Sequence, residues 1–173
     1  MLGTVTVDEA TQAVRESPDR ARLELISPFI EAAGRVLRQE CGESVDKGQV
    51  FRVRSPQTCN EVSAMIAITG KIAGLVIYSM STSTACTIAG RMIGEEVATL
   101  DGMAQSAIAE LANMITGQAG IGLARAGFTS DMSPPILLVG NGSMIATFDL
   151  TRLVIPLVMS FGEIQVDIAI KEA

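Results

Sequence analysis

The chain has 173 residues, of which 48% are hydrophobic and 18% are charged, so one domain with a sizeable core is the simplest organisation. A net charge of −6 and an aromatic content of 3% argue against nucleic-acid binding, which needs a basic surface and stacking side chains. The absence of histidine excludes Ser-His and Cys-His nucleophilic catalysis, imidazole bases and most transition-metal sites. Any chemistry must therefore use carboxylates, amides, hydroxyls or lysine.

No part of the sequence predicts export or membrane insertion. The N-terminus lacks a basic segment followed by an apolar one, so we expect no signal peptide. The longest uncharged run, between Lys71 and Arg91, contains six serines and threonines, which argues against a membrane span. The three cysteines are irregularly spaced, which is typical of reduced, buried thiols and not of a disulfide framework or zinc site. We expect a cytoplasmic protein with no metal site of its own.

The N-terminal stretch, residues 1–22, differs from the remainder of the chain. It is charged, interrupted by Pro18 and weakly periodic, which predicts a partly ordered arm. The arm contains no motif with a recognisable function, and a solvated tail is the simplest interpretation. Residues 23–173 are expected to form the single domain.

Three helices are predicted in this domain. The first covers residues 27–42, with Ser27 as its N-cap and Pro28 in its first turn. The second covers 81–94, where hydroxyl residues can cap the start and a glycine ends the helix. The third and longest runs from about 101 to 126. Its three glycines each lower helix propensity by roughly 1 kcal/mol relative to alanine.

The remaining apolar runs predict strands. The short break between 61–70 and 73–80 predicts a hairpin, and Asn141-Gly142 predicts a turn. In the last strand apolar and polar residues alternate, which predicts a strand covered on one face only. The predicted strands are 49–54, 61–70, 73–80, 136–140, 143–150, 152–161 and 163–171.

The order of these elements is helix, strands, two helices and strands. It predicts an α+β fold in which long helices pack on one side of an antiparallel sheet. A duplicated helix-plus-hairpin unit would give this fold an internal pseudo-two-fold repeat. The chain has neither the βαβαβ order of a doubly wound nucleotide-binding fold nor a phosphate-binding GxxxxGK loop.

The third helix carries a polar stripe within an apolar sequence. At 100° per residue, Ser106, Glu110, Asn113 and Gly117 share a sector opposite the apolar one. Glu110 and Asn113 are about 60° apart around the helix and about 4.5 Å apart along it, so both can act on one small object. Ala109 and Gly117 are small and leave the stripe unscreened. With no lysine or arginine near it on this helix, Glu110 is available to a cation from another protein.

A solvated helix face without function also accounts for this pattern, and it is the commoner case. The first helix provides a comparison, since Glu31 is followed by Gly34 at i+3 and Arg35 at i+4. We expect Glu31 and Arg35 to form an ordinary surface pair, worth about 0.3–0.5 kcal/mol. The combination of glutamate and asparagine thus occurs on one helix only.

Several segments resemble the CheC/CheX/FliY family of chemotaxis phosphatases, and its CheX members most closely. The resemblance covers roughly residues 23–171, and its signature is Glu-x-x-Asn on a long helix, here Glu110 and Asn113, with Ser106 at a small or acidic position. The segments are "SPFIEAAGRVL" at 27–37, "GLVIYSMSTSTACTIAGRMIGEE" at 74–96, "AIAELANMITGQA" at 107–119 and "SPPILLVGNG" at 133–142.

The resemblance implies a phosphatase that hydrolyses the aspartyl phosphate of a CheY-type response regulator. Glu110 would anchor on the lysine of the receiver's active site, and Asn113 would hold a water in line with the phosphorus. Ser106, Ala109 and Gly117 would contact the partner. The receiver would supply Mg²⁺, so the resemblance implies no cofactor of the chain's own. An acyl phosphate has a good leaving group, and positioning can replace a strong base.

The resemblance also implies a homodimer formed through sheet edges, and a single active motif, because Gly34 replaces the asparagine on the first helix. Two other functions remain open. The chain could be a non-catalytic module that binds phosphorylated receivers through the same helix face. It could also be a structural component of a flagellar or signalling assembly in which the sheet edge binds and the stripe has no role.

Overall fold

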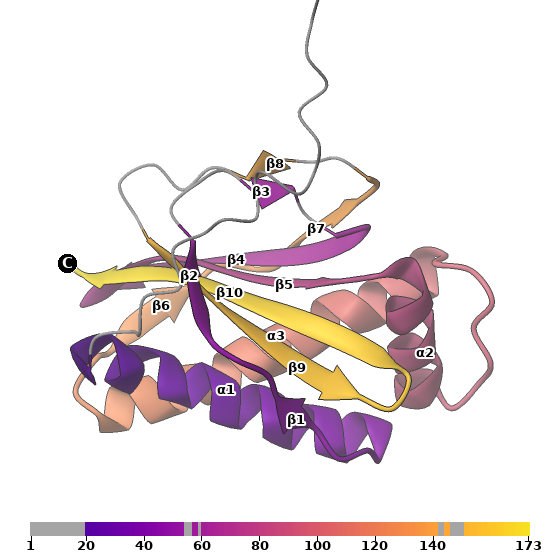
Figure 1. Ribbon diagram of the computed structural model, residues 1–173, viewed down its shortest axis with the longest axis horizontal. Helices are drawn as coiled ribbons and strands as arrows, with labels where there is room; N and C mark the ends of the chain where they lie inside the picture. Colours follow the sequence, from indigo (N-terminus) through magenta and orange to yellow (C-terminus); the bar gives the residue numbers. More distant parts are fainter. Residues whose placement is uncertain (1–19, 54–56, 59, 142–143, 146–150) are drawn as a thin grey trace, which may run out of the picture.

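The computed structural model describes residues 20–53, 57–58, 60–141, 144–145 and 151–173 (Figure 1). The arm predicted at 1–22 lies outside the described residues up to residue 19, and the first helix begins at Arg20. The helices are α1 (Arg20–Cys41), α2 (Thr82–Ile93) and α3 (Gly102–Arg125). The strands are β1 (Asp46–Lys47), β2 (Phe51–Val53), β3 (Gln57–Thr58), β4 (Val62–Gly70), β5 (Ile72–Met80), β6 (Ser130–Met132), β7 (Ile136–Val139), β8 (Met144–Ile145), β9 (Arg152–Met159) and β10 (Gly162–Glu172).

The main sheet is antiparallel, with the strand order β1-β9-β10-β5-β4-β6. Strand β2 also pairs with β9 and β7 with β4, while β3 and β8 form a separate pair. The hairpins β4-β5 and β9-β10 meet at the centre, where β10 pairs with β5 from Ile164↔Met80 to Glu172↔Ile72. Helix α1 precedes the first hairpin and α3 precedes the second, so the chain repeats one helix-plus-hairpin unit.

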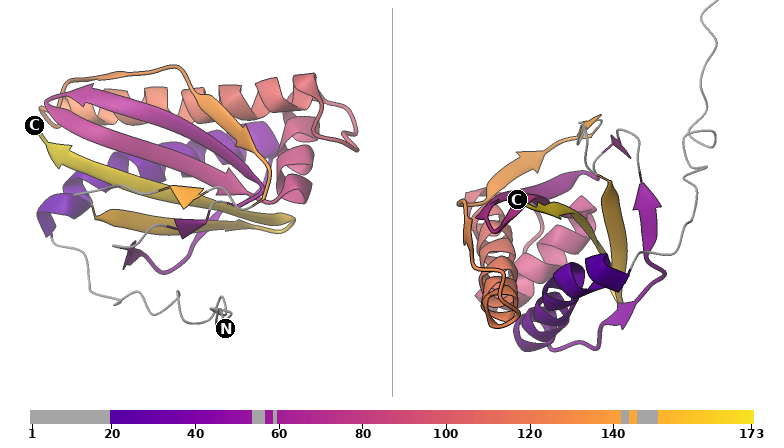
Figure 2. Two further views of the ribbon diagram at one scale, coloured as in Figure 1. Left: turned by 90° about the horizontal axis from the view of Figure 1, so that it is seen from above. Right: turned by 90° about the vertical axis from the view of Figure 1, so that its left-hand side faces the viewer.

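All three helices lie on one face of the sheet (Figure 1). Helices α1 and α3 run side by side, and the shorter α2 packs against both near one end of the sheet (Figure 2). The core between the layers contains side chains from every helix and from the central strands, including Phe29, Val36, Tyr78, Ile88, Ile108, Leu111 and Val166. This arrangement confirms the predicted α+β fold.

Local signals at the ends of α2 and α3 explain why both helices match the sequence prediction. The Ser81 hydroxyl accepts a hydrogen bond from the Thr84 amide at 3.1 Å, and Gly94 ends α2 with a left-handed φ of 82°. Asp101 caps α3 by accepting the Ala104 amide at 2.9 Å. These bonds satisfy amides that have no partner within the first turn of a helix.

The predicted start of α1 is wrong, because the helix begins seven residues before Ser27. Ser27 does not cap the helix; its hydroxyl donates to the Leu23 carbonyl at 2.9 Å, and Pro28 lies inside the helix. The apolar face continues before Ser27, where Leu25 and Ile26 are buried. Burial of these side chains outweighs the local cap signal. The predicted end is correct, with a glycine in the left-handed region directly after Cys41.

The prediction that the last strand is covered on one face only is also wrong. The four apolar residues that alternate along β10 are buried, but so are Asp167 and Ala169 on its other face, at 5% and 1% exposure. Asp167 accepts a hydrogen bond from Gln165 at 2.9 Å and faces Arg152 at 3.8 Å. The β3–β8 pair lies on this side of the sheet (Figure 1). Strand β8 falls within the predicted strand 143–150, most of which lies outside the described residues, as does Gly142.

Candidate functional site

The polar stripe predicted on α3 lies on the surface of the molecule. Ser106, Glu110, Asn113 and Gly117 are all exposed, whereas Ile108 and the other apolar residues of the opposite sector are buried. In Figure 2, α3 lies at the border of the helical layer, between α1 and β6, with one long side turned away from both. The helix thus presents Glu110 and Asn113 together on one outward face.

A buried hydrogen bond fixes how α3 lies on the sheet. The Tyr78 hydroxyl on β5 is 2.7 Å from the Thr116 hydroxyl on α3. Thr116 donates its own proton to the Ala112 carbonyl at 2.8 Å, so Tyr78 must be the donor of the first bond. Desolvation raises the pKa of Tyr78 well above its usual value, which keeps the phenol protonated. Since Thr116 is three residues after Asn113, this bond also fixes the outward direction of Asn113.

The Glu110 carboxylate and the Asn113 amide have no partner among the residues that the structure describes. In the described part of the chain, no hydrogen bond or ion pair involves the carboxylate of Glu110 or the side-chain amide of Asn113. Ser106 differs from them, because its hydroxyl donates to the Gly102 carbonyl of the same helix at 2.9 Å. Glu110 and Asn113 are therefore the groups on this face that can act on another molecule.

The surface around Glu110 and Asn113 is formed in part by small residues. Ala109 is half-buried, and Gly117 lies in open space, since a Cβ atom built on it meets nothing within 4 Å. The packing of α3 therefore does not require a glycine at this position. A partner surface can approach the backbone of α3 closely at Gly117.

The site is chemically incomplete without a second molecule. A free carboxylate can receive a cation, and a free carboxamide can both donate and accept hydrogen bonds to orient a water. Among the residues that the structure describes, no group of three or more His, Cys, Asp or Glu side chains is arranged to hold a metal ion. A reaction centre at this surface would need further groups from a partner.

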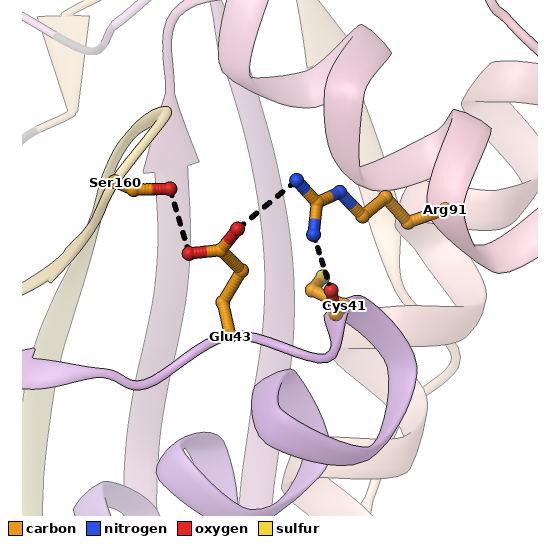
Figure 3. Close-up of polar contacts among 4 residues, drawn as sticks. All are labelled: Cys41, Glu43, Arg91 and Ser160. Carbon is orange, nitrogen blue, oxygen red and sulfur yellow. Dashed lines mark hydrogen bonds and ion pairs between the residues drawn. The ribbon is translucent and has the colours of Figure 1, made fainter.

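A second polar cluster, which the sequence did not predict, joins the end of α1 to α2 and the β9–β10 turn (Figure 3). Arg91 donates to the Cys41 carbonyl at 2.6 Å, pairs with Glu43 at 3.0 Å and lies 5.0 Å from the centre of the Phe161 ring. Ser160 donates to Glu43 at 2.6 Å, and this bond together with Arg91 lowers the pKa of Glu43. These groups satisfy one another, so the cluster stabilises the fold and is not a reactive centre.

The two described cysteines agree with the prediction of reduced, buried thiols. Cys41 and Cys86 are free and buried, while Cys59 lies outside the described residues. Burial raises the pKa of the Cys41 thiol, which makes it a poor nucleophile. Neither described cysteine competes with the α3 stripe as a reactive site.

The family model described as "Chemotaxis phosphatase CheX" matches residues 62–157, which include the whole of α3. A curated relative from Thermotoga maritima, the CheY-P phosphatase CheX, is 31% identical over 125 residues, covering 72% of this chain and 81% of the relative. The chain belongs to the CheX family of chemotaxis phosphatases. The resemblance that the Glu-x-x-Asn motif indicated is thereby confirmed.

Solved structures of the CheX family share the fold. The chemotaxis protein CheX of Desulfovibrio desulfuricans is 26% identical with a TM-score of 0.77, and the match covers 87% of this chain and 99% of that one. The CheX chain in a complex of CheX, CheY, BeF3 and Mg²⁺ from Borrelia burgdorferi is 28% identical with a TM-score of 0.74, covering 86% and 98%. No helix of the described residues is long and apolar enough to cross a membrane.

Proposed function

We propose that this protein hydrolyses the aspartyl phosphate of a CheY-type response regulator. The observation that carries the proposal is the outward pair Glu110 and Asn113, which has no partner among the described residues and lies within the segment that matches the CheX family. Two relatives support it: the Thermotoga maritima protein is named a CheY-P phosphatase, and the Borrelia burgdorferi protein forms a complex with CheY.

In this mechanism Glu110 is the anchor and Asn113 the water-positioning group. The Glu110 carboxylate forms an ion pair with the lysine of the receiver's active site, which brings α3 against the reaction centre. The Asn113 amide enters that centre and holds a water in line with the phosphorus. An uncharged amide suits this role because it does not repel the phosphoryl oxygens. The chain needs no base of its own, since phosphoryl transfer depends mainly on positioning and charge neutralisation.

The receiver supplies the metal and the phosphate-binding groups. Mg²⁺ held by the receiver would neutralise charge on the phosphoryl oxygens, and the phosphatase would contribute no cofactor. Ser106, Ala109 and Gly117 form the low surface on which the receiver rests around Glu110 and Asn113. The exposure of Ser106 and Gly117 and the half-buried position of Ala109 support this assignment.

A cytoplasmic homodimer completes the proposal. Strand β7 pairs only with β4 among the described strands, and it exposes Ile136 and Val139 at 61% and 54%. An edge strand with exposed apolar side chains favours pairing with a second copy. Light scattering should give a dimer mass for the wild type and a lower mass for Ile136→Lys, and a monomeric wild type would contradict the dimer.

The direct test is phosphate release from a receiver. Candidate receivers are loaded with a small-molecule phosphodonor, and phosphate loss is followed with wild-type and Asn113→Ala protein. Acceleration by the wild type but not by Asn113→Ala supports the proposal. Binding without acceleration would instead identify a non-catalytic receiver-binding module. Partner binding that survives substitution of both Glu110 and Asn113 would favour a structural component of an assembly.

A further inference from the structure

A groove of about 770 Å³ runs between α1, from Glu24 to Arg35, and the C-terminal half of α3. Its walls contain Pro28, Glu31 and Arg35 from α1, and Gln118 and Ile121 from α3. The two helices that line it, α1 and α3, are neighbours on one face of the sheet (Figure 1). The groove is distinct from the stripe that carries Glu110 and Asn113.

Packing between the two helices defines the shape of the groove. A Cβ atom on Gly122 would lie 3.1 Å from the Pro28 side chain, so the helices are in close contact at this point. Arg35 donates to the Gln118 side chain at 3.4 Å and so joins α1 to α3. The expected surface pair of Arg35 with Glu31 does not form between these described residues. The walls are therefore held by contacts that do not depend on a partner.

The groove is continuous with the stripe through one residue. Ile121 is 56% exposed, lies one turn after Gly117 on the stripe side of α3, and also lines the groove. It is eight residues from Asn113, which corresponds to about 12 Å along the helix axis. An exposed isoleucine at the junction of a polar stripe and a groove marks a contact surface more specifically than a scattered surface apolar residue.

The size of a specific interface requires surface beyond the stripe. One side of such an interface contains about 20–30 residues and buries about 800 Å². Ser106, Glu110, Asn113 and Gly117 provide only a small part of that area. A receiver that docks over Glu110 and Asn113 must therefore extend over neighbouring surface, and the groove is the hollow that adjoins the stripe.

We propose that the phosphorylated receiver inserts a second part of its surface, with an apolar side chain, into the α1–α3 groove against Ile121. This inference rests on the proposed function and adds a specificity-determining contact to it. The groove is lined by two arginines and two glutamates, namely Arg35, Arg125, Glu24 and Glu31. These charges cancel, so the groove selects its occupant by shape and apolar contact, while Glu110 provides the charge-dependent anchor.

The test compares two exposed apolar residues on the same helix. Ile121→Ser should raise KM for the phosphorylated receiver about fivefold with kcat unchanged, because an apolar docking contact is lost without altering the reaction centre. Met103→Ser is the matched control. Met103 is 65% exposed and seven residues before Glu110, at about the same separation from the pair, but it does not line the groove. Its substitution should leave KM unchanged.

A third variant blocks the groove from α1. Ser27 is exposed, lines the groove and lies on a different helix from the pair, so Ser27→Trp should fill the hollow and raise KM with kcat unchanged. Thermal unfolding of each variant verifies that the fold is intact. Unchanged KM for both Ile121→Ser and Ser27→Trp overturns the groove contact and leaves the phosphatase activity standing. An equal rise for Met103→Ser also overturns it. A wild type that accelerates no receiver overturns both proposals.

Discussion

The hydroxyl oxygens of Tyr78 and Thr116 lie 2.7 Å apart in the buried interface between β5 and α3. Tyr78 is on the central strand that joins the two hairpins, and Thr116 is on the helix that carries the candidate site. This bond connects the centre of the sheet directly to the helix. It therefore links the stability of the fold to the orientation of Asn113.

We expect Tyr78→Phe to lower the free energy of unfolding by about 1 kcal/mol, since it removes one buried hydrogen bond while Thr116 keeps its bond to the Ala112 carbonyl. Thr116→Val should cost more, about 2–3 kcal/mol, because it leaves the Tyr78 hydroxyl buried without a partner. Urea denaturation monitored by circular dichroism measures both. A larger loss for the phenylalanine variant than for the valine variant would contradict the assigned donor.

The two residues of the pair should have different kinetic effects. Asn113→Ala should lower kcat by about 10²-fold or more with little change in KM, since it removes a group that acts in the transition state. Glu110→Ala should raise KM and lower turnover together, because it removes the anchor. Steady-state phosphate release from a phosphorylated receiver separates the two. Glu96→Ala, at an exposed carboxylate in the α2–α3 loop, is the control and should behave as wild type.

Gly117→Ala should raise the stability of the protein but weaken its binding of the receiver. A methyl group at this position meets no atom of the protein within 4 Å, so the variant should gain up to about 1 kcal/mol of stability from higher helix propensity. The same methyl group lies on the docking surface and should raise KM for the receiver. Gly102→Ala, at another open position on α3, should leave KM unchanged. Unaltered KM in Gly117→Ala would show that the receiver does not approach the helix backbone at this point.

The cluster around Arg91 should make stability depend on acid pH. The hydrogen bond from Ser160 and the nearby Arg91 lower the pKa of Glu43 below its unfolded value, so its stabilising contribution is complete above the unfolded pKa and is lost as pH falls through the folded pKa. Glu43→Gln should therefore destabilise the protein at pH 7 and have little effect in strong acid. Asp167 has the opposite effect on the pH dependence of stability. Burial raises its pKa, so at this residue a fall in pH favours the folded state.

The contribution of Glu43 can be measured by urea denaturation. The midpoints of the wild type and of Glu43→Gln are compared from pH 7 down to pH 3. The difference between the two proteins isolates Glu43, because Asp167 is common to both. A difference that stays constant over the whole range would mean that the carboxylate does not titrate with folding.

The parts of the fold that follow from local signals were predictable from sequence. Hydroxyl residues suited to capping and a terminal glycine located α2, and apolar helical periodicity located α3; the structure identifies the capping residues as Ser81 and Asp101. The start of α1 was not predictable in this way, because Ser27 and Pro28 form a convincing local cap signal. Burial of the preceding residues against the sheet overrides that signal.

Contacts between distant segments account for most of the other differences. Asp167 reads as a solvent-facing residue in an alternating strand, but it is buried opposite Arg152 from the neighbouring strand. The bond between Glu43 and Ser160 joins residues 117 positions apart, and no local pattern indicates it. The groove likewise requires the packing of α1 against α3.

The candidate site was partly predictable. Helical periodicity alone placed Glu110 and Asn113 on one outward face, as observed. It could not assign a role to either residue, because any helix has a solvated side. Their roles follow from the resemblance to the CheX family and remain predictions.

The convex face of α3 also bears on selectivity among phosphorylated compounds in the cell. If Asn113 acts on a docked receiver, free acyl phosphates and other small metabolites lack the docking surface that would hold them beside it. They should survive in the presence of the protein, while the same type of bond in a docked receiver is broken. Under the proposed mechanism, discrimination of this kind needs no gate or lid, because the receiver brings the other half of the reaction centre.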